Sequence, residues 1–185
     1  MKMLSFYAFL ALGLLLDGAM LFRILLVCAA LHEAGHVLAY IFCAHRLPKL
    51  TCCASGICLS RTAPLSLACR TGVLCAGPAA NFAACILLYV RAQQCASYGA
   101  YLVAAVNLCT GLYNLLPFGA LDGAQLMEGL LPARLLPAWT RTQRFLLTAA
   151  CVVLPLCAWL GAWPMTARVA AVVAPVYLFL QNTLS

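Results

Sequence analysis

The chain has four acidic residues and three histidines, and three of these seven lie within the five positions His32 to His36. On a helix, His32 and His36 are four residues apart, about 6 Å along the axis, so both imidazoles point the same way. Two such nitrogens can bind one zinc ion, and Glu33 projects from a neighbouring part of that face, where its carboxylate can take a proton from water. The chemistry that this HExxH pattern indicates is hydrolysis.

An HExxH sequence also arises by chance on ordinary amphipathic helices. Here the motif lies inside the apolar run from Ile24 to Cys43. Each ionisable group at bilayer depth costs roughly 2.5 to 3.5 kcal/mol, so three together are difficult to explain by packing alone. We interpret them as a metal site.

A catalytic zinc site of this type needs a third protein ligand and an open position for water. The acids outside the motif are Asp17, Asp122 and Glu128. Pro117 and Gly119 predict a break in the helix, after which the chain can restart as a helix with Asp122 near its N-cap. A plain N-cap would need no metal, but the other two acids follow no such break. Asp122 is therefore the best candidate for the third ligand.

Two asparagines, Asn81 and Asn114, offer uncharged hydrogen-bonding groups within apolar runs. Asn81 follows Gly77-Pro78, which loosens the backbone ladder of a membrane helix, but a proline kink with a helix-helix hydrogen bond explains it equally well. Asn114 precedes the predicted break and can bond freed backbone groups or a substrate carbonyl.

The composition predicts an all-α polytopic membrane protein of one domain, residues 1–185, with about six transmembrane helices. The chain is 66% apolar and 8% charged, with a mean hydropathy of +1.02. Its eleven Lys and Arg give a formal net charge of +7, but they are scattered singly between apolar runs, which suits anchoring at membrane edges and argues against nucleic-acid binding. The expected catalytic core is about 24–131, with accessory helices at 3–22 and 145–180.

The spans are bounded by basic and turn-forming residues. We expect a turn around Arg23, where Asp17 can pair with Arg23, and a polar connection from Pro132 to Arg144. Six spans place eight basic residues on the side of the termini and three on the other, which predicts cytoplasmic termini. The predicted spans are Met3–Phe22, Ile24–Cys43, Leu67–Val90, Ser97 to the break at Pro117, Phe145–Trp163 and Val169–Leu180.

Between the second and third spans, Leu50 to Ser60 favours a short strand or hairpin, because it is rich in Thr, Ser, Cys and Ile around Gly56. The segment is too short to span, so it would be re-entrant or interfacial. Its edge could pair with an extended substrate, although an ordinary connecting loop remains an alternative.

The twelve cysteines resemble a disulfide framework only in number. Most lie in or at the ends of apolar runs, where cysteine acts as a small hydrophobe, and we expect reduced thiols. The single loop cluster, Cys52, Cys53 and Cys58, lacks a CxxC spacing, so we do not expect a second zinc site there.

The order of three motifs resembles the site-2 protease family of intramembrane zinc metalloproteases. They are HEAGH in the second span, GPAANF in the third, and NLLPFGALDG at the end of the fourth, and the match covers roughly residues 24–131. The compact layout is most similar to the sporulation branch typified by stage IV sporulation protein FB, although we expect neither the CBS domain of that branch nor the PDZ domain of the envelope-stress branch. A second glycine often found after LDG is Ala124 here.

The resemblance implies that His32, His36 and Asp122 bind one zinc ion, that Glu33 is the catalytic base, and that Asn81 and Asn114 lie near substrate. It also implies an integral protein of a bacterial cytoplasmic membrane that cleaves a membrane-tethered protein, with possible inhibitory membrane partners. A sporulation sigma-factor precursor, an anti-sigma factor and signal-peptide remnants all fit as substrates. The rival hypotheses are a non-catalytic membrane chaperone and a metal transporter, although a transporter usually places polar groups in matched halves of the chain.

Overall fold

The structure is a computed structural model, and it describes residues 14–15, 17–18, 20–53, 56–60, 65–118, 121–161, 168 and 171–172. The chain divides into two compact units, Met1–Leu115 and Leu116–Ser185, which we describe separately.

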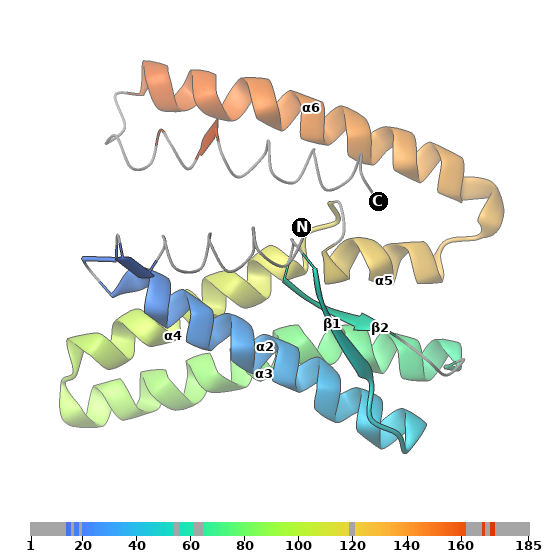
Figure 1. Cartoon of the computed structure of the whole chain (residues 1–185). Helices are drawn as coiled ribbons and strands as arrows, with labels where there is room; N and C mark the ends of the chain where they lie inside the picture. The colour runs from blue at the N-terminus through green and yellow to red at the C-terminus, as the bar shows by residue number, and fades with distance from the viewer. Residues whose placement is uncertain are drawn as a thin grey trace. The chain divides into compact units, whose positions relative to one another are not determined.

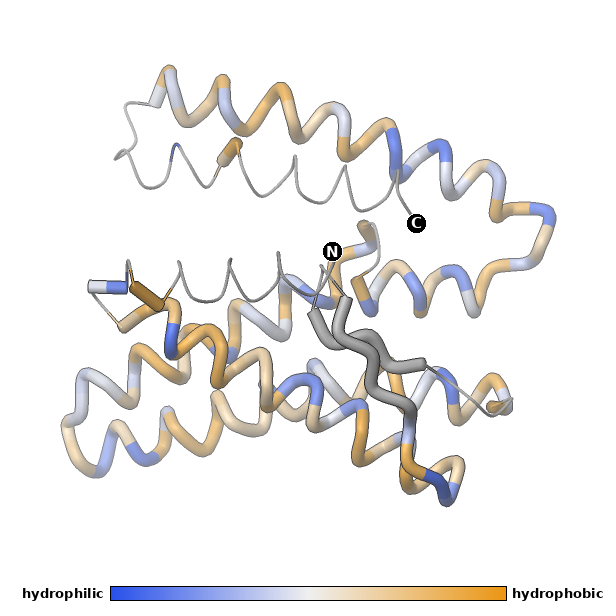
Figure 2. The backbone as a smooth tube through the Cα atoms, viewed as in Figure 1, coloured by the Kyte–Doolittle hydropathy of each residue, from blue (hydrophilic) through white to orange (hydrophobic). Residues whose placement is uncertain are grey.

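Three helices form the body of the first unit: α2 (Leu21–Ala44), α3 (Leu67–Cys95) and α4 (Tyr98–Asn114). Each of them packs against the other two (Figure 1). A serine begins both α3 and α4: the Ser66 hydroxyl accepts a hydrogen bond from the Cys69 backbone N–H at 3.2 Å, and the Ser97 hydroxyl accepts one from Ala100 at 3.4 Å. Hydrophobic residues predominate along the three helices (Figure 2), as expected for elements that face apolar surroundings.

Glycines set how closely these helices approach. A Cβ added at Gly35 of α2 would lie 2.6 Å from the Ala76 carbonyl oxygen of α3, and one added at Gly111 of α4 would lie 2.7 Å from the Phe82 ring of α3. Small residues at these positions allow the backbones to pack closely, as in other membrane helix pairs. The α2 helix, which carries the HExxH, is therefore held directly against α3.

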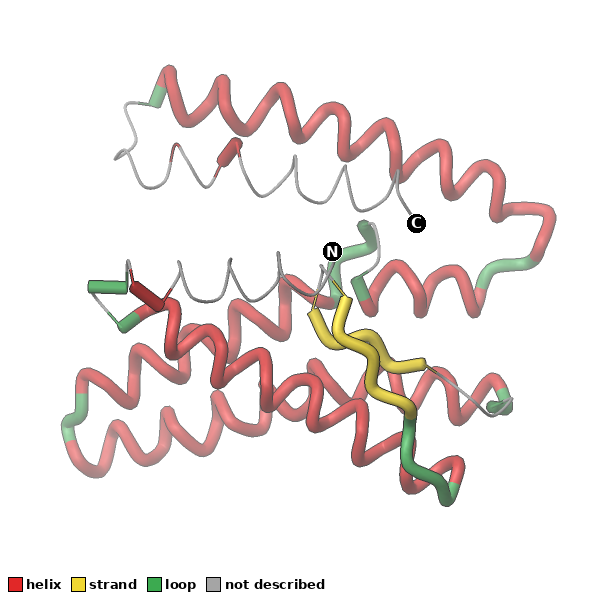
Figure 3. The backbone as a smooth tube through the Cα atoms, viewed as in Figure 1, coloured by secondary structure: helices red, strands yellow, loops and turns green. Residues whose placement is uncertain are grey.

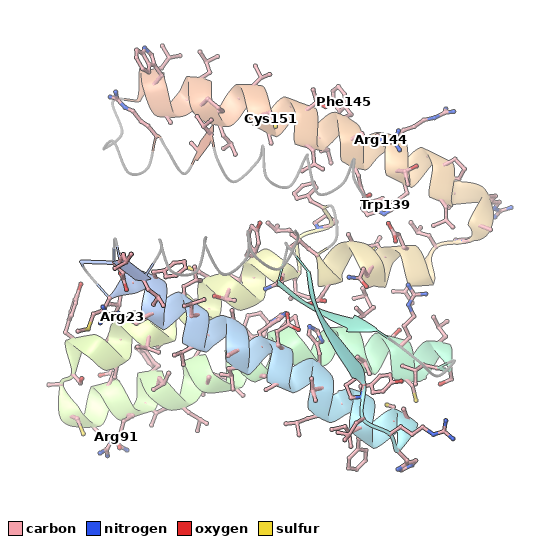
Figure 4. The ribbon with its side chains drawn as sticks, viewed as in Figure 1. Arg23, Arg91, Trp139, Arg144, Phe145 and Cys151 are labelled. Atoms are coloured by element: carbon pink, nitrogen blue, oxygen red, sulfur yellow. The ribbon has the colours of Figure 1, made fainter. Side chains whose placement is uncertain are left out.

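The start of α2 differs from the prediction. Arg23 was expected in a turn between two spans, but Leu21, Phe22 and Arg23 all belong to α2. The predicted ion pair is present, with Arg23 Nε 3.7 Å from Asp17 Oδ2 (Figure 4 labels Arg23). In addition, the Asp17 carboxylate accepts hydrogen bonds from the backbone N–H groups of Phe22 and Arg23, both at 3.1 Å. These bonds satisfy donors that a helix start leaves open, and this explains why the helix begins before Arg23. Most of the predicted span Met3–Phe22 lies outside the described residues.

Two short strands follow α2, β1 (Lys49–Cys53) and β2 (Gly56–Ser60) (Figure 3). They pair antiparallel, with Leu50 opposite Leu59 and Thr51 opposite Cys58. This is the stretch where the sequence predicts a short strand or hairpin. The side chains of Cys52, Cys53 and Cys58 lie outside the description, whereas the nine cysteines whose side chains are described are free thiols.

The second unit contains α5 (Asp122–Leu130), the short 3-10 helix η1 (Ala133–Leu135) and α6 (Leu136–Leu160). The predicted polar connection from Pro132 to Arg144 is wrong over most of its length, because α6 already begins at Leu136. Pro137 lies in the first turn, where its missing N–H would have had no partner within the helix, and arginine is a good helix former. Pro137, Arg141 and Arg144 therefore do not interrupt this helix.

Among the described residues, three helical segments are long and apolar enough to cross a membrane: Leu21–Ala44, Leu67–Cys95 and Ala133–Leu160. The α4 helix, predicted as a span, has 17 residues and covers about 26 Å, which is short of the roughly 30 Å of a bilayer core. The predicted last span, Val169–Leu180, lies outside the described residues except for 171–172.

Candidate metal centre

His32 and His36, which we call the histidine pair, lie in the middle of α2 and are both buried, with 4% and 8% of their surface exposed. Their Nε2 atoms are 3.1 Å apart and their rings are nearly perpendicular, at 88°. The four-residue spacing thus brings two nitrogens together inside the protein.

The backbone of α3 selects the tautomer of His36. Its Nδ1 atom lies 2.7 Å from the Val73 carbonyl oxygen. A carbonyl oxygen can only accept, so Nδ1 carries the hydrogen and donates it. In the neutral ring, Nε2 then presents its lone pair towards His32. This is the usual arrangement of a metal-binding histidine, whose second nitrogen donates to a carbonyl or carboxylate.

The distance between the two nitrogens fits a zinc ion. Two nitrogens bound to one tetrahedral zinc ion at about 2.05 Å stand roughly 3.3 Å apart. The observed 3.1 Å is close to that value. The two Nε2 atoms are therefore spaced as two ligands of one zinc ion would be.

Gly77 of α3 provides the room for both rings. A Cβ at this position would overlap His36 Nε2 and would lie 2.6 Å from His36 Cε1 and 2.8 Å from His32 Cε1. Any side chain here would therefore displace the edges of the imidazoles that carry the ligand atoms. The prediction assigned Gly77 only to loosening of the backbone beside Pro78, yet α3 continues through Pro78 without ending.

The two predicted acids occupy helical positions. Glu33 is half-buried on α2, beside His32. Asp122 is half-buried and is the first residue of α5, with Leu121 rather than Asp122 as the N-cap. An acid in a first turn is favoured by the exposed N–H groups and the helix dipole. The three proposed ligands offer two imidazole nitrogens and one carboxylate oxygen, a donor set that suits zinc.

The two predicted asparagines differ in their surroundings. Asn81 is fully buried on α3, one turn beyond Gly77, and neither atom of its amide has a hydrogen-bond partner among the described residues. The Asn114 amide donates to the Thr110 carbonyl oxygen at 3.0 Å, one turn back on α4. The Asn114 side chain therefore bonds to a carbonyl of its own helix.

Sequence reasoning missed two features of the centre: the Val73 carbonyl and the steric role of Gly77. A backbone carbonyl belongs to every residue type and leaves no signal in a sequence. The glycine did carry a signal, since Gly77 interrupts an apolar helix, but its purpose depends on which helix packs against it.

No family model matches the sequence, and no curated protein sequence matches it. Three chains among the solved structures do match. One is the site-2 protease from Methanocaldococcus jannaschii, which is 19% identical, with a TM-score of 0.69 over 98% of this chain and 87% of that one. At this level of identity the similarity shows the fold, and the chain shares its fold with a site-2 protease.

Proposed function

We propose that this chain is an intramembrane zinc metalloprotease of the site-2 type, which cleaves a membrane-tethered protein substrate. The observation that carries the proposal is the histidine pair: two buried imidazoles, with Nε2 atoms 3.1 Å apart and His36 oriented by the Val73 carbonyl. The shared fold with a site-2 protease supports the same reading.

His32 Nε2, His36 Nε2 and the Asp122 carboxylate would hold the zinc ion. When bound, zinc supplies an activated water and polarises the carbonyl under attack. Glu33 lies beside His32 and accepts the proton of the attacking water. The same carboxyl group then donates this proton to the leaving amine, so that one water and one peptide bond become a carboxylic acid and an amine. Gly77 leaves the approach to the ring edges free of a side chain.

Asn81 and Asn114 are proposed to hold the backbone of the substrate. A peptide bond inside a helix is shielded, so the substrate must unwind locally and its freed carbonyl and N–H groups need partners. The amide of Asn81 offers both a donor and an acceptor, and both are unused by the described residues. The strands β1 and β2 also offer an outer edge, where an extended substrate can add as a further strand.

The finer identity of the substrate follows from the resemblance to the sporulation branch: a sigma-factor precursor, with an anti-sigma factor or signal-peptide remnants as alternatives. The protein would act in a bacterial cytoplasmic membrane with both termini in the cytoplasm. A non-catalytic membrane chaperone and a metal transporter are the candidate functions of another class. Of these three functions, only the protease needs Glu33 as a general base in addition to the three metal ligands.

The decisive experiment compares wild type with Glu33→Gln, purified in detergent, for zinc content and for cleavage of tagged membrane-tethered substrates. We expect Glu33→Gln to retain zinc and to lose cleavage by about 10²- to 10⁴-fold, because it removes a general base and no ligand. His36→Ala should lose both zinc and cleavage, and Asp122→Asn should lower the zinc content.

Glu128→Gln is the matched control, because it makes the same chemical change in a carboxylate outside the proposed site. This control should cleave as wild type does. A Glu33→Gln protein that still cleaves would remove Glu33 from its role, and unchanged zinc in Asp122→Asn would remove Asp122 from the ligand set. Zinc binding without cleavage of any substrate by wild type would favour the chaperone or the transporter.

A further inference from the structure

The segment that joins α4 to α5 leads into Asp122. The α4 helix ends at Asn114 and α5 begins at Asp122. Within the second unit, the Leu121 N–H donates to the Phe118 carbonyl at 3.3 Å. Pro117 has no N–H, so its carbonyl oxygen is the only group of its backbone that can form a hydrogen bond.

Gln143 of α6 supplies the donor for that carbonyl. Its amide nitrogen lies 3.2 Å from the Pro117 oxygen, 26 residues away in the sequence. The side chain is buried, with 2% of the residue exposed. Thr140, Thr142 and Thr148 of the same helix all bond to carbonyls of α6 itself. Gln143 is thus distinguished by reaching out of its helix to a different segment.

The orientation of α6 agrees with this contact. Trp139 lies one turn before Gln143, so the two share a face. Trp139 points from α6 towards α5, whereas Arg144 points away (Figure 4). The face that carries Gln143 is therefore the face turned towards the other elements of its own unit.

The hydrogen bond between Gln143 and Pro117 matters because both groups would be costly to bury without a partner. A backbone carbonyl without a partner in an apolar environment is costly, and so is a buried glutamine amide. The hydrogen bond between the Gln143 amide and the Pro117 carbonyl offsets the cost of burying both groups. It therefore holds the Pro117 carbonyl at the position of the amide. Pro117 fixes its own φ, and only four residues separate it from Asp122. An anchor at Pro117 therefore limits where the carboxylate of Asp122 can lie.

We infer that Gln143 is a positioning residue for Asp122, and that it acts on zinc affinity through the Pro117 carbonyl. The inference rests on the proposed function, because it requires Asp122 to be a zinc ligand. Mutation of a residue that orients a metal ligand without binding the metal typically weakens metal affinity by 10- to 100-fold.

The test is the zinc dissociation constant of the full-length protein in detergent, measured by competition with a chelator. Gln143→Met keeps the length of the side chain and removes the donor, and we expect zinc to bind about tenfold more weakly. Thr142→Val is the matched control, because its hydroxyl bonds to Ala138 of the same helix, and its zinc affinity should equal that of wild type. If Gln143→Met does not fold, Gln143→Asn shortens the side chain by one methylene, keeps the amide and should weaken zinc in the same direction.

A double-mutant cycle separates positioning from general damage. In an Asp122→Ala background, zinc affinity should be low, and Gln143→Met should lower it no further. An equal fold-loss in both backgrounds, or an unchanged affinity in the single variant, would overturn the inference. If Asp122→Ala alone binds zinc as wild type does, the ligand assignment in the proposed function has failed instead.

Discussion

At the scale of single residues, the candidate metal centre depends on a position that has no side chain. Gly77 lies against both rings of the histidine pair, and an added Cβ would lie 2.6 Å and 2.8 Å from their Cε1 atoms. The Val73 carbonyl, one turn earlier on α3, fixes the orientation of His36. The geometry of the two imidazoles on α2 is therefore set by the helix that packs against them.

We expect Gly77→Ala to weaken zinc binding by tenfold or more, and to lower the free energy of unfolding by about 1–3 kcal/mol, because the rings must move to admit the methyl group. Gly72→Ala is the control on the same helix, since nothing lies within 4 Å of its added Cβ. That variant should bind zinc normally and should be as stable as wild type or more so, because alanine is the better helix former. Chelator competition and thermal unfolding in detergent measure both quantities. Equal zinc affinity in the two variants would contradict the role of Gly77.

At the scale of elements, α2 is held in place by its packing against α3 and by hydrogen bonds at its first turn. Gly35 brings it close to α3, and Asp17 holds its first turn. The Asp17 side chain is 4% exposed, whereas the Arg23 side chain is 55% exposed. The bond from the Phe22 N–H is partly buried, and the ion pair ends on a side chain that is mostly exposed. The two backbone hydrogen bonds should therefore contribute more to stability than the ion pair does.

This difference gives a prediction for the start of α2. Asp17→Ala should lower the free energy of unfolding by about 0.5–2 kcal/mol, the usual cost of losing a helix cap. Arg23→Gln removes only the partly exposed ion pair, and its effect should be smaller. Denaturant titration of both variants in the same detergent measures the loss of unfolding free energy in each. A larger loss in Arg23→Gln would mean that the ion pair, and not the cap, stabilises this end of the helix.

At the scale of the whole molecule, the fold is that of a site-2 protease, and three helical segments among the described residues have the length and composition of membrane spans. Large apolar side chains such as Val27, Leu38 and Phe42 are exposed on α2, while the two histidines of the same helix are buried. This distribution, with polar groups inside and apolar groups outside, suits a protein in which lipid is the solvent.

A bound zinc ion should stabilise this fold. Binding to the folded state alone adds about 2.7 kcal/mol when free zinc is 100 times its dissociation constant. We therefore expect the unfolding temperature of wild type to fall when a chelator is added and to recover with zinc. His36→Ala should show no such response, and Mg²⁺, which prefers oxygen ligands, should not replace zinc. A wild-type protein indifferent to zinc would argue against the metal centre.

The sequence by itself determined the local features. The four-residue spacing of His32 and His36 places both rings on one face of any helix, and long apolar runs predict helices wherever they occur. The apolar run that begins at Leu67 predicted the start of α3, and the break at Pro117 and Gly119 predicted a new helix near Asp122, because both signals are local.

Tertiary structure alone decided the contacts between distant residues. The bond from His36 to Val73 spans 37 residues and that from Gln143 to Pro117 spans 26, and both end on a carbonyl that every residue type possesses. The early start of α6 was missed because arginine marks a membrane edge and a helix equally well. Local chemistry repeats at fixed spacings along the chain, whereas the partner of a backbone carbonyl or of a glycine is chosen only when the helices pack.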